Sequence, residues 1–196
     1  MIIIPGSVTL RDLQKIFLND LPVKLCPSVR NKIEQAAILV KEMSSSGIPT
    51  YGINTGFGKL ATKTIGFKDI EKLQHNLILS HCSGVGPPIA QKMVRFIIVL
   101  KLLSLGRGAS GVRWELCQLL EGMLQHSVLP LIPSQGSVGA SGDLAPLAHM
   151  AAVMIGEGKA TFNGKLMPAR DALTYAGLSP IKLGPKEGLA LINGTQ

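Results

Sequence analysis

The segment 139–143 contains residue types that together can build an electrophile, which ordinary side chains do not supply. The Gly142 nitrogen can attack the Ala140 carbonyl, and loss of two water molecules then gives a five-membered methylidene-imidazolone ring. Because Gly142 lacks a Cβ, its backbone adopts turns that other residues resist, and Ser141 carries the hydroxyl that leaves. Taken alone, Ala140-Ser141-Gly142 is also consistent with a plain turn before a helix capped by Asp143.

Three further polar residues lie where chemistry is conceivable, and each also has an ordinary structural interpretation. Tyr51 is in the Gly-rich segment 51–58, but a phenol with a pKa near 10 acts as a base only where its surroundings stabilise phenolate. The structural alternative is a half-buried Tyr51 whose hydroxyl bonds the backbone. Asn193 precedes a glycine, which is typical of a plain turn. His81 lies near the end of a predicted helix, where histidine is commonly structural.

The run from Gly136 to His149 (GSVGASGDLAPLAH) resembles the aromatic amino acid ammonia-lyases, which use a methylidene-imidazolone ring. Two other segments match in the order that this family has them, Tyr51–Gly58 (YGINTGFG) and Asn193–Gln196 (NGTQ). The resemblance extends over essentially the whole chain from Ile4. It is similar to the N-terminal portion of the histidine-selective members.

The resemblance implies a role for each of these segments. Ala140, Ser141 and Gly142 would form the ring autocatalytically, with Asp143 helping to fix the loop. Tyr51 would remove the substrate β-proton, and Asn193 would hold the substrate carboxylate.

The pair Ser80-His81 resembles the histidine-selective form of the family's specificity segment. Tyrosine-selective relatives are expected to have His-Leu there, and phenylalanine-selective relatives Phe-Leu. His81 is therefore expected to hydrogen-bond the imidazole of L-histidine. The implied products are trans-urocanate and ammonia. A Cys82–His81 nucleophile is rejected, because adjacent helical residues point apart.

Family members continue with a long helical bundle that supplies a further tyrosine, an arginine and a glutamate, and they form homotetramers. The resemblance thus implies that residues 1–196 are an electrophile-bearing N-terminal domain without that C-terminal bundle. We expect negligible activity from this chain alone, and association with the missing part or into a homo-oligomer. Two alternatives stay open: a non-catalytic remnant that acts only through partners, and a tyrosine or phenylalanine ammonia-lyase or aminomutase.

Composition excludes several other classes of function. The net charge is +8, but the basic residues are dispersed without interleaved aromatics, which indicates solvated helix faces rather than nucleic-acid binding. Three widely spaced cysteines indicate neither a zinc site nor disulfides and fit a cytoplasmic location. The histidines have no metal-ligand spacing, so no metal is expected. The apolar run 96–105 is too short for a membrane span and is interrupted by Lys101.

Hydrophobic periodicity and Gly/Pro breaks predict a mainly α chain with a few short strands and one β-hairpin, the helical N-terminal part of the ammonia-lyase fold. Ser28 and Asp69 are predicted helix N-caps. Asn163-Gly164 is predicted to form a type I′ hairpin turn. The predicted helices are 9–19, 28–45, 69–81, 89–105, 112–126, 144–155 and 168–176. The predicted strands are 2–4, 23–25 and the two arms of hairpin 160–167.

Overall fold

The computed structural model describes residues 1–138 and 142–194, and the predicted mainly α fold with short strands is confirmed there. The α-helices are α1 Leu10–Asn19, α2 Arg30–Ser45, α3 Phe67–His81, α4 Gln91–Gly106, α5 Trp114–His126, α6 Leu144–Met154, α7 Ala169–Tyr175 and α8 Glu187–Ile192. The strands are β1 Ile2–Ile3, β2 Lys24–Leu25, β3 Val85–Pro88, β4 Leu129–Pro130, β5 Pro133–Gln135, β6 Lys159–Phe162 and β7 Lys165–Pro168. Single 3₁₀ turns cover Pro27–Val29 and Gly58–Leu60.

The strands form small sheets at the edges of the helical body. β1 pairs with β2 in parallel, and β6 and β7 form the predicted hairpin with β4 added antiparallel to β6. Asn163 and Gly164 have φ angles of 48° and 73°, as a type I′ turn requires. The β3–β5 pair is not among the predicted strands, because prolines such as Pro87 and Pro88 are unfavourable within strands.

Two predicted helix caps are wrong by a few residues. Pro27–Val29 is a 3₁₀ turn, so α2 begins at Arg30 after Val29, and the Ser28 hydroxyl contacts the Cys26 sulfur instead. α3 begins at Phe67 after Gly66, which puts Asp69 in the first turn rather than at the cap. An acidic side chain there still interacts favourably with the helix dipole.

Helices α4, α5 and α6 contribute about half of the apolar core, and about half of the residues of α4 are buried. Its two interior cations are both buried, which corrects the general expectation that the dispersed basic residues lie on solvated helix faces. Arg95 is 7% exposed and donates to main-chain carbonyls of Asp20, Leu21 and Leu124. Lys101 is 3% exposed. Within residues 1–138 and 142–194, no helix is long and apolar enough to cross a bilayer.

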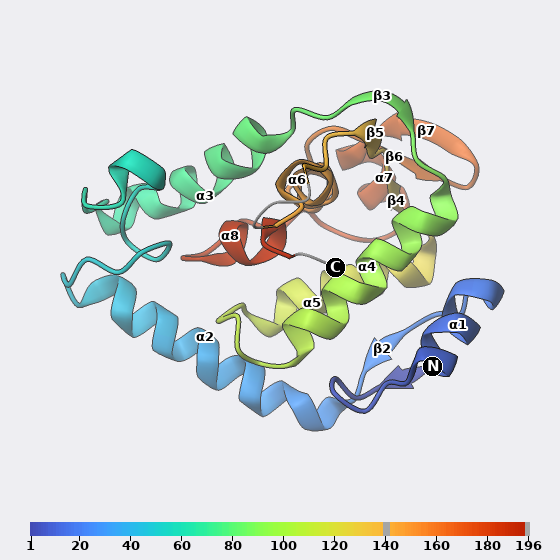
Figure 1. Cartoon of the computed structure of the whole chain (residues 1–196), viewed down its shortest axis with the longest axis horizontal. Coiled ribbons are helices and arrows are strands. Elements are labelled where there is room, and N and C mark those ends of the chain that lie inside the picture. The colour runs from blue at the N-terminus through green and yellow to red at the C-terminus, as the bar shows by residue number, and fades with distance from the viewer. Residues whose placement is uncertain (139–141, 195–196) are drawn as a thin grey trace.

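The short helix α8 lies near the middle of the molecule (Figure 1). No hydrophobic periodicity in the sequence predicted this helix. It packs against α3 and α6, and Lys101 of α4 bonds its last turn. Helices α3, α4 and α6, which are far apart in the sequence, therefore meet around these six residues. His81 ends α3, and Gly142 and Asp143 precede α6.

Candidate active site

The loop that carries Tyr51 rests on α8. A Cβ built on Gly52 would lie 2.5 Å from Leu189 Cδ2, and φ at Gly52 is +75°, so this contact needs glycine. Buried Asn54 fixes the loop, because its Oδ1 accepts from the Thr50 amide at 2.7 Å and its Nδ2 donates to the Ile48 carbonyl at 2.9 Å.

Tyr51 itself is 57% exposed and meets Phe57 edge-to-face, with ring centroids 5.9 Å apart. Its hydroxyl has no hydrogen bond within the described part of the chain. The alternative of a half-buried tyrosine whose hydroxyl bonds the backbone is therefore wrong. The Tyr51 ring packs against Phe57, and its hydroxyl is unbonded within residues 1–138 and 142–194.

His81 ends α3 and has one ring nitrogen committed. Nδ1 lies 2.8 Å from the Leu77 carbonyl oxygen and 3.1 Å from the Ser80 hydroxyl oxygen. Because the carbonyl can only accept, we assign the proton to Nδ1. In a neutral imidazole, Nε2 is then the acceptor. Burial raises the pKa of the neighbouring Cys82 to about 11, which keeps that thiol protonated near neutral pH and agrees with the rejection of a Cys–His nucleophile.

Buried Gln74, which sequence analysis did not single out, connects α3 to α8. Its Oε1 accepts from the Leu189 amide at 3.3 Å, and a Cβ on Gly188 would lie 2.8 Å from the same oxygen. The side chain is 0% exposed. No pattern in the sequence distinguishes this glutamine from the solvated polar residues of an amphipathic helix.

Asn193 and Gly142, predicted as substrate-binding and ring-forming residues, lie side by side. A Cβ built on Gly142 would be 3.4 Å from Asn193 Oδ1 and 3.5 Å from the Gly194 nitrogen, and φ at Gly142 is +98°. The other two predicted ring residues, Ala140 and Ser141, lie outside the described residues. The φ angle at position 142 therefore favours glycine, while Asn193 Oδ1 lies at ordinary van der Waals distance from the Cβ position, and this arrangement leaves room for the ring-closing nitrogen that the sequence predicts.

Asp143 takes the N-cap position of α6 but does not cap it with its side chain. The carboxylate instead accepts a hydrogen bond from the Ser137 hydroxyl, while its main-chain amide donates to the Gly194 carbonyl at 2.7 Å. Asp143 therefore holds the loop before α6 through two hydrogen bonds. Its predicted N-cap position is confirmed, but its side chain makes no capping bond.

The ammonium of Lys101 lies beside the segment that contains Asn193 and Gly194. It donates to the carbonyls of Asn193 at 2.8 Å and Ala190 at 3.1 Å, and burial lowers its pKa to about 8. A cavity of about 340 Å³ is lined by Lys101, Asp143 and Gly194 together with apolar side chains of α4 and α6. In the sequence, the sign of a buried lysine here is its isolated position within the apolar run 96–105.

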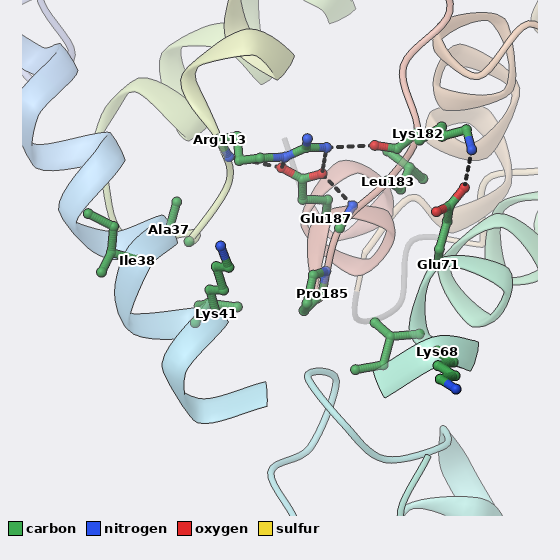
Figure 2. A pocket seen from close by; sticks show the side chains of 14 residues that line it. Ala37, Ile38, Lys41, Lys68, Glu71, Arg113, Lys182, Leu183, Pro185 and Glu187 are labelled. Atoms are coloured by element: carbon green, nitrogen blue, oxygen red, sulfur yellow. Dashed lines mark hydrogen bonds and ion pairs between the residues drawn. The ribbon is translucent and has the colours of Figure 1, made fainter. Parts of the chain in front are cut away.

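A larger cavity, of about 720 Å³, lies elsewhere, between α2, α3 and α8. Figure 2 shows Glu187 facing Arg113 there, with Ile38 of α2 across the opening. Tyr51, His81 and Asn193 do not line it. No group of three or more His, Cys, Asp and Glu side chains in residues 1–138 and 142–194 is arranged to hold a metal ion.

The model of a protein family described as aromatic amino acid lyase matches residues 8–196 of this chain. Phenylalanine aminomutase from Pantoea agglomerans is 33% identical, with a TM-score of 0.93, over 100% of this chain and 38% of that one. Histidine ammonia-lyase from Trypanosoma cruzi is 35% identical, with a TM-score of 0.89, over 100% and 38%. Ergothionase from Treponema denticola, an ergothioneine-degrading enzyme, is 31% identical, with a TM-score of 0.93, over 100% and 39%. The chain thus spans less than two fifths of the length of each.

Proposed function

Because the chain belongs to the aromatic amino acid lyase family, we propose that it supplies the electrophile-bearing part of a histidine ammonia-lyase. The reaction would release ammonia from L-histidine and leave trans-urocanate. Membership of this family supports an ammonia-lyase reaction. The substrate and the residues that act on it are proposed here from the site.

The geometry of His81 carries the choice of substrate. With Nδ1 donating to the Leu77 carbonyl at 2.8 Å, Nε2 is left to accept a hydrogen bond from an imidazole N–H. A polar partner of this kind discriminates against a phenyl side chain, because binding that ring would leave the histidine nitrogen unpaired. Relatives that act on phenylalanine and tyrosine share the fold, so the fold itself does not select the substrate.

The other predicted residues divide the remaining tasks. Asn193, beside Gly142, would donate from its amide to the substrate carboxylate. The exposed phenol of Tyr51 would take the β-proton. The methylidene-imidazolone ring, built from Ala140, Ser141 and Gly142, would supply the electron sink that ordinary side chains lack.

Turnover would also need the part of the relatives' length that this chain does not span. We propose that this part, or further copies of the chain in a homotetramer, covers the exposed apolar side chains of the N-terminal body. Leu10 and Met93, for example, are 84% and 46% exposed. Burying such surface would favour association.

The test is deamination of L-histidine, L-tyrosine and L-phenylalanine by the purified protein. Each amino acid is assayed with and without a polypeptide covering the remaining length of the Trypanosoma histidine ammonia-lyase. Histidine should be preferred, and a Ser80→His, His81→Leu double variant should lower its turnover by roughly 10²-fold or more.

The matched control is His75→Leu, a histidine on the same helix whose ring lies 3.9 Å from Glu157 and which has no predicted part in the site. It should leave the preference unchanged. A double variant that keeps the histidine preference would refute the substrate assignment. If no amino acid is deaminated in any combination, the non-catalytic alternative is favoured.

A further inference from the structure

We propose that Lys101 is a positioning residue that holds the Asn193–Gly194 segment against the ring-forming loop. The inference rests on the proposed function of that loop. Lys101 itself would touch neither the substrate nor the reacting atoms.

The environment of Lys101 is unusual for a lysine. Its side chain is 3% exposed, and its ammonium bonds two carbonyl oxygens, those of Ala190 and Asn193. No carboxylate pairs with it among the described residues. Burying a cation is costly, and burial lowers the pKa of Lys101 to about 8. A methionine would fill the same volume without that cost, so the distinctive contribution of the amine is its hydrogen bonds.

The two carbonyls that it bonds lie at the end of α8, where helical carbonyls lack intrahelical partners. The ammonium therefore fixes the direction in which the chain leaves that helix. Gly194 is held closely there, since a Cβ on it would lie 3.3 Å from Lys101 Nζ and 3.4 Å from Leu147 Cδ1 of α6. The segment is thus confined between α4 and α6.

A hydrogen bond connects this segment to the loop. The Gly194 carbonyl accepts from the Asp143 amide at 2.7 Å, and Asp143 directly follows Gly142, whose nitrogen would close the ring. Asn193 Oδ1 approaches the Cβ position of Gly142 from the same segment. Removing the ammonium would free the Asn193–Gly194 segment, and the loop would then lose the hydrogen bond that holds its C-terminal end. Cyclisation requires that the loop be compressed, so it should slow.

The experiment compares purified wild-type protein with Lys101→Met, Lys101→Gln, Lys101→Arg and Lys92→Met. Lys92 is the matched control, because it lies on the same helix and its amine also donates to a carbonyl, that of Leu18 at 3.2 Å. Protein is taken at successive times after induction, and the folded fraction is isolated by size exclusion. Intact mass then gives the fraction that has lost two water molecules, and thermal unfolding is recorded alongside.

Lys101→Met should slow the loss of water by roughly 10- to 100-fold, since displacements of about 1 Å have effects of this size on reacting groups. Lys101→Arg should restore most of the rate, because a guanidinium can also donate to two carbonyls. Lys101→Gln, which is shorter, should be intermediate, and Lys92→Met should match the wild type.

A purely structural lysine would lower the unfolding temperature without changing ring formation in the folded fraction. Full water loss at the wild-type rate in folded Lys101→Met refutes the positioning role alone. If Lys101→Met does not fold, the same result in folded Lys101→Gln refutes it. A wild-type protein that never loses two waters refutes both this role and the proposed function of the loop.

Discussion

The main-chain amide of Asp143 donates a 2.7 Å hydrogen bond to the carbonyl oxygen of Gly194. This bond joins the loop before α6 to the segment after α8, and so brings Gly142 next to Asn193. Three more segments converge on α8, through Gly52, Gln74 and Arg113. A six-residue helix therefore organises the candidate site, and several of its contacts can be tested one at a time.

Gly52→Ala tests the contact between the Tyr51 loop and α8. Both Gly52 and the control Gly47 have a positive φ, +75° and +74°, but only at Gly52 does a built Cβ collide, 2.5 Å from Leu189. Gly47→Ala should lower the free energy of unfolding by about 1 kcal/mol, the cost of the left-handed backbone. Gly52→Ala should lose a further ~1–3 kcal/mol from overpacking. Equal losses in urea denaturation would show that the loop does not rest on Leu189.

Glu187→Gln tests the anchor at the start of α8. The carboxylate is buried and accepts from the Arg113 guanidinium at 2.8 Å and from the Gly184 amide at 2.7 Å. Breaking a buried pair costs ~3–5 kcal/mol, and the partial exposure of Arg113 reduces our expectation to about 2 kcal/mol.

The control for this variant is Glu71→Gln. Glu71 pairs with Lys182 at 3.4 Å, but both side chains are more than half exposed. Its loss should be at most about 0.5 kcal/mol. Similar unfolding free energies for the two variants would contradict a structural role for Glu187.

The buried imidazole of His149 should make the stability of the protein depend on pH. Its Nε2 accepts from the Gly84 amide at 3.1 Å, and burial lowers its pKa below the usual 6.5. The unfolded state therefore takes up a proton first as the pH falls, and stability is lost from about pH 6.5 downward through the lower folded pKa. His149→Gln, whose amide oxygen can accept the same bond, should flatten the unfolding free energy between about pH 7.5 and pH 5. A variant curve that keeps the wild-type slope would exclude His149 as its source.

Tyr51→Phe separates catalysis from folding. The hydroxyl makes no hydrogen bond within the described part of the chain, so its removal should leave the unfolding temperature unchanged. Under the conditions in which histidine is turned over, the rate should fall by roughly 10²- to 10⁴-fold, the typical contribution of a general base. Tyr175→Phe is the control, because that side chain is also largely exposed, at 70%. A Tyr51→Phe protein with normal turnover would remove Tyr51 from the mechanism.

Sequence patterns predicted those parts of the fold whose causes are local. The hairpin at Asn163-Gly164 follows from two residues that accept positive φ. The start of α1 follows from Thr9, whose hydroxyl accepts from the Asp12 amide in a capping box. These elements would form the same way in many proteins.

Other features depend on contacts between distant segments, and the sequence does not display them. Strand β3 exists because Val85 pairs with Gln135, and α8 is stabilised by Glu187 and Gln74, which bond other parts of the chain. The lysine at 101 interrupts an apolar run, yet only the fold shows that two carbonyls receive its ammonium. Resemblance identifies the ring-forming loop and the Tyr51 segment, whereas the contact of Gly52 with α8 and the bond from Asp143 to Gly194, just after α8, are visible only in the structure.

The central claim is that Ala140-Ser141-Gly142 becomes an electrophile, and the intact mass of the purified protein tests it most directly. We expect a mass lower than that of the unmodified sequence by two water molecules, with the deficit absent from a Ser141→Ala variant. An unmodified mass in correctly folded wild-type protein, or the same deficit in Ser141→Ala, would contradict the account.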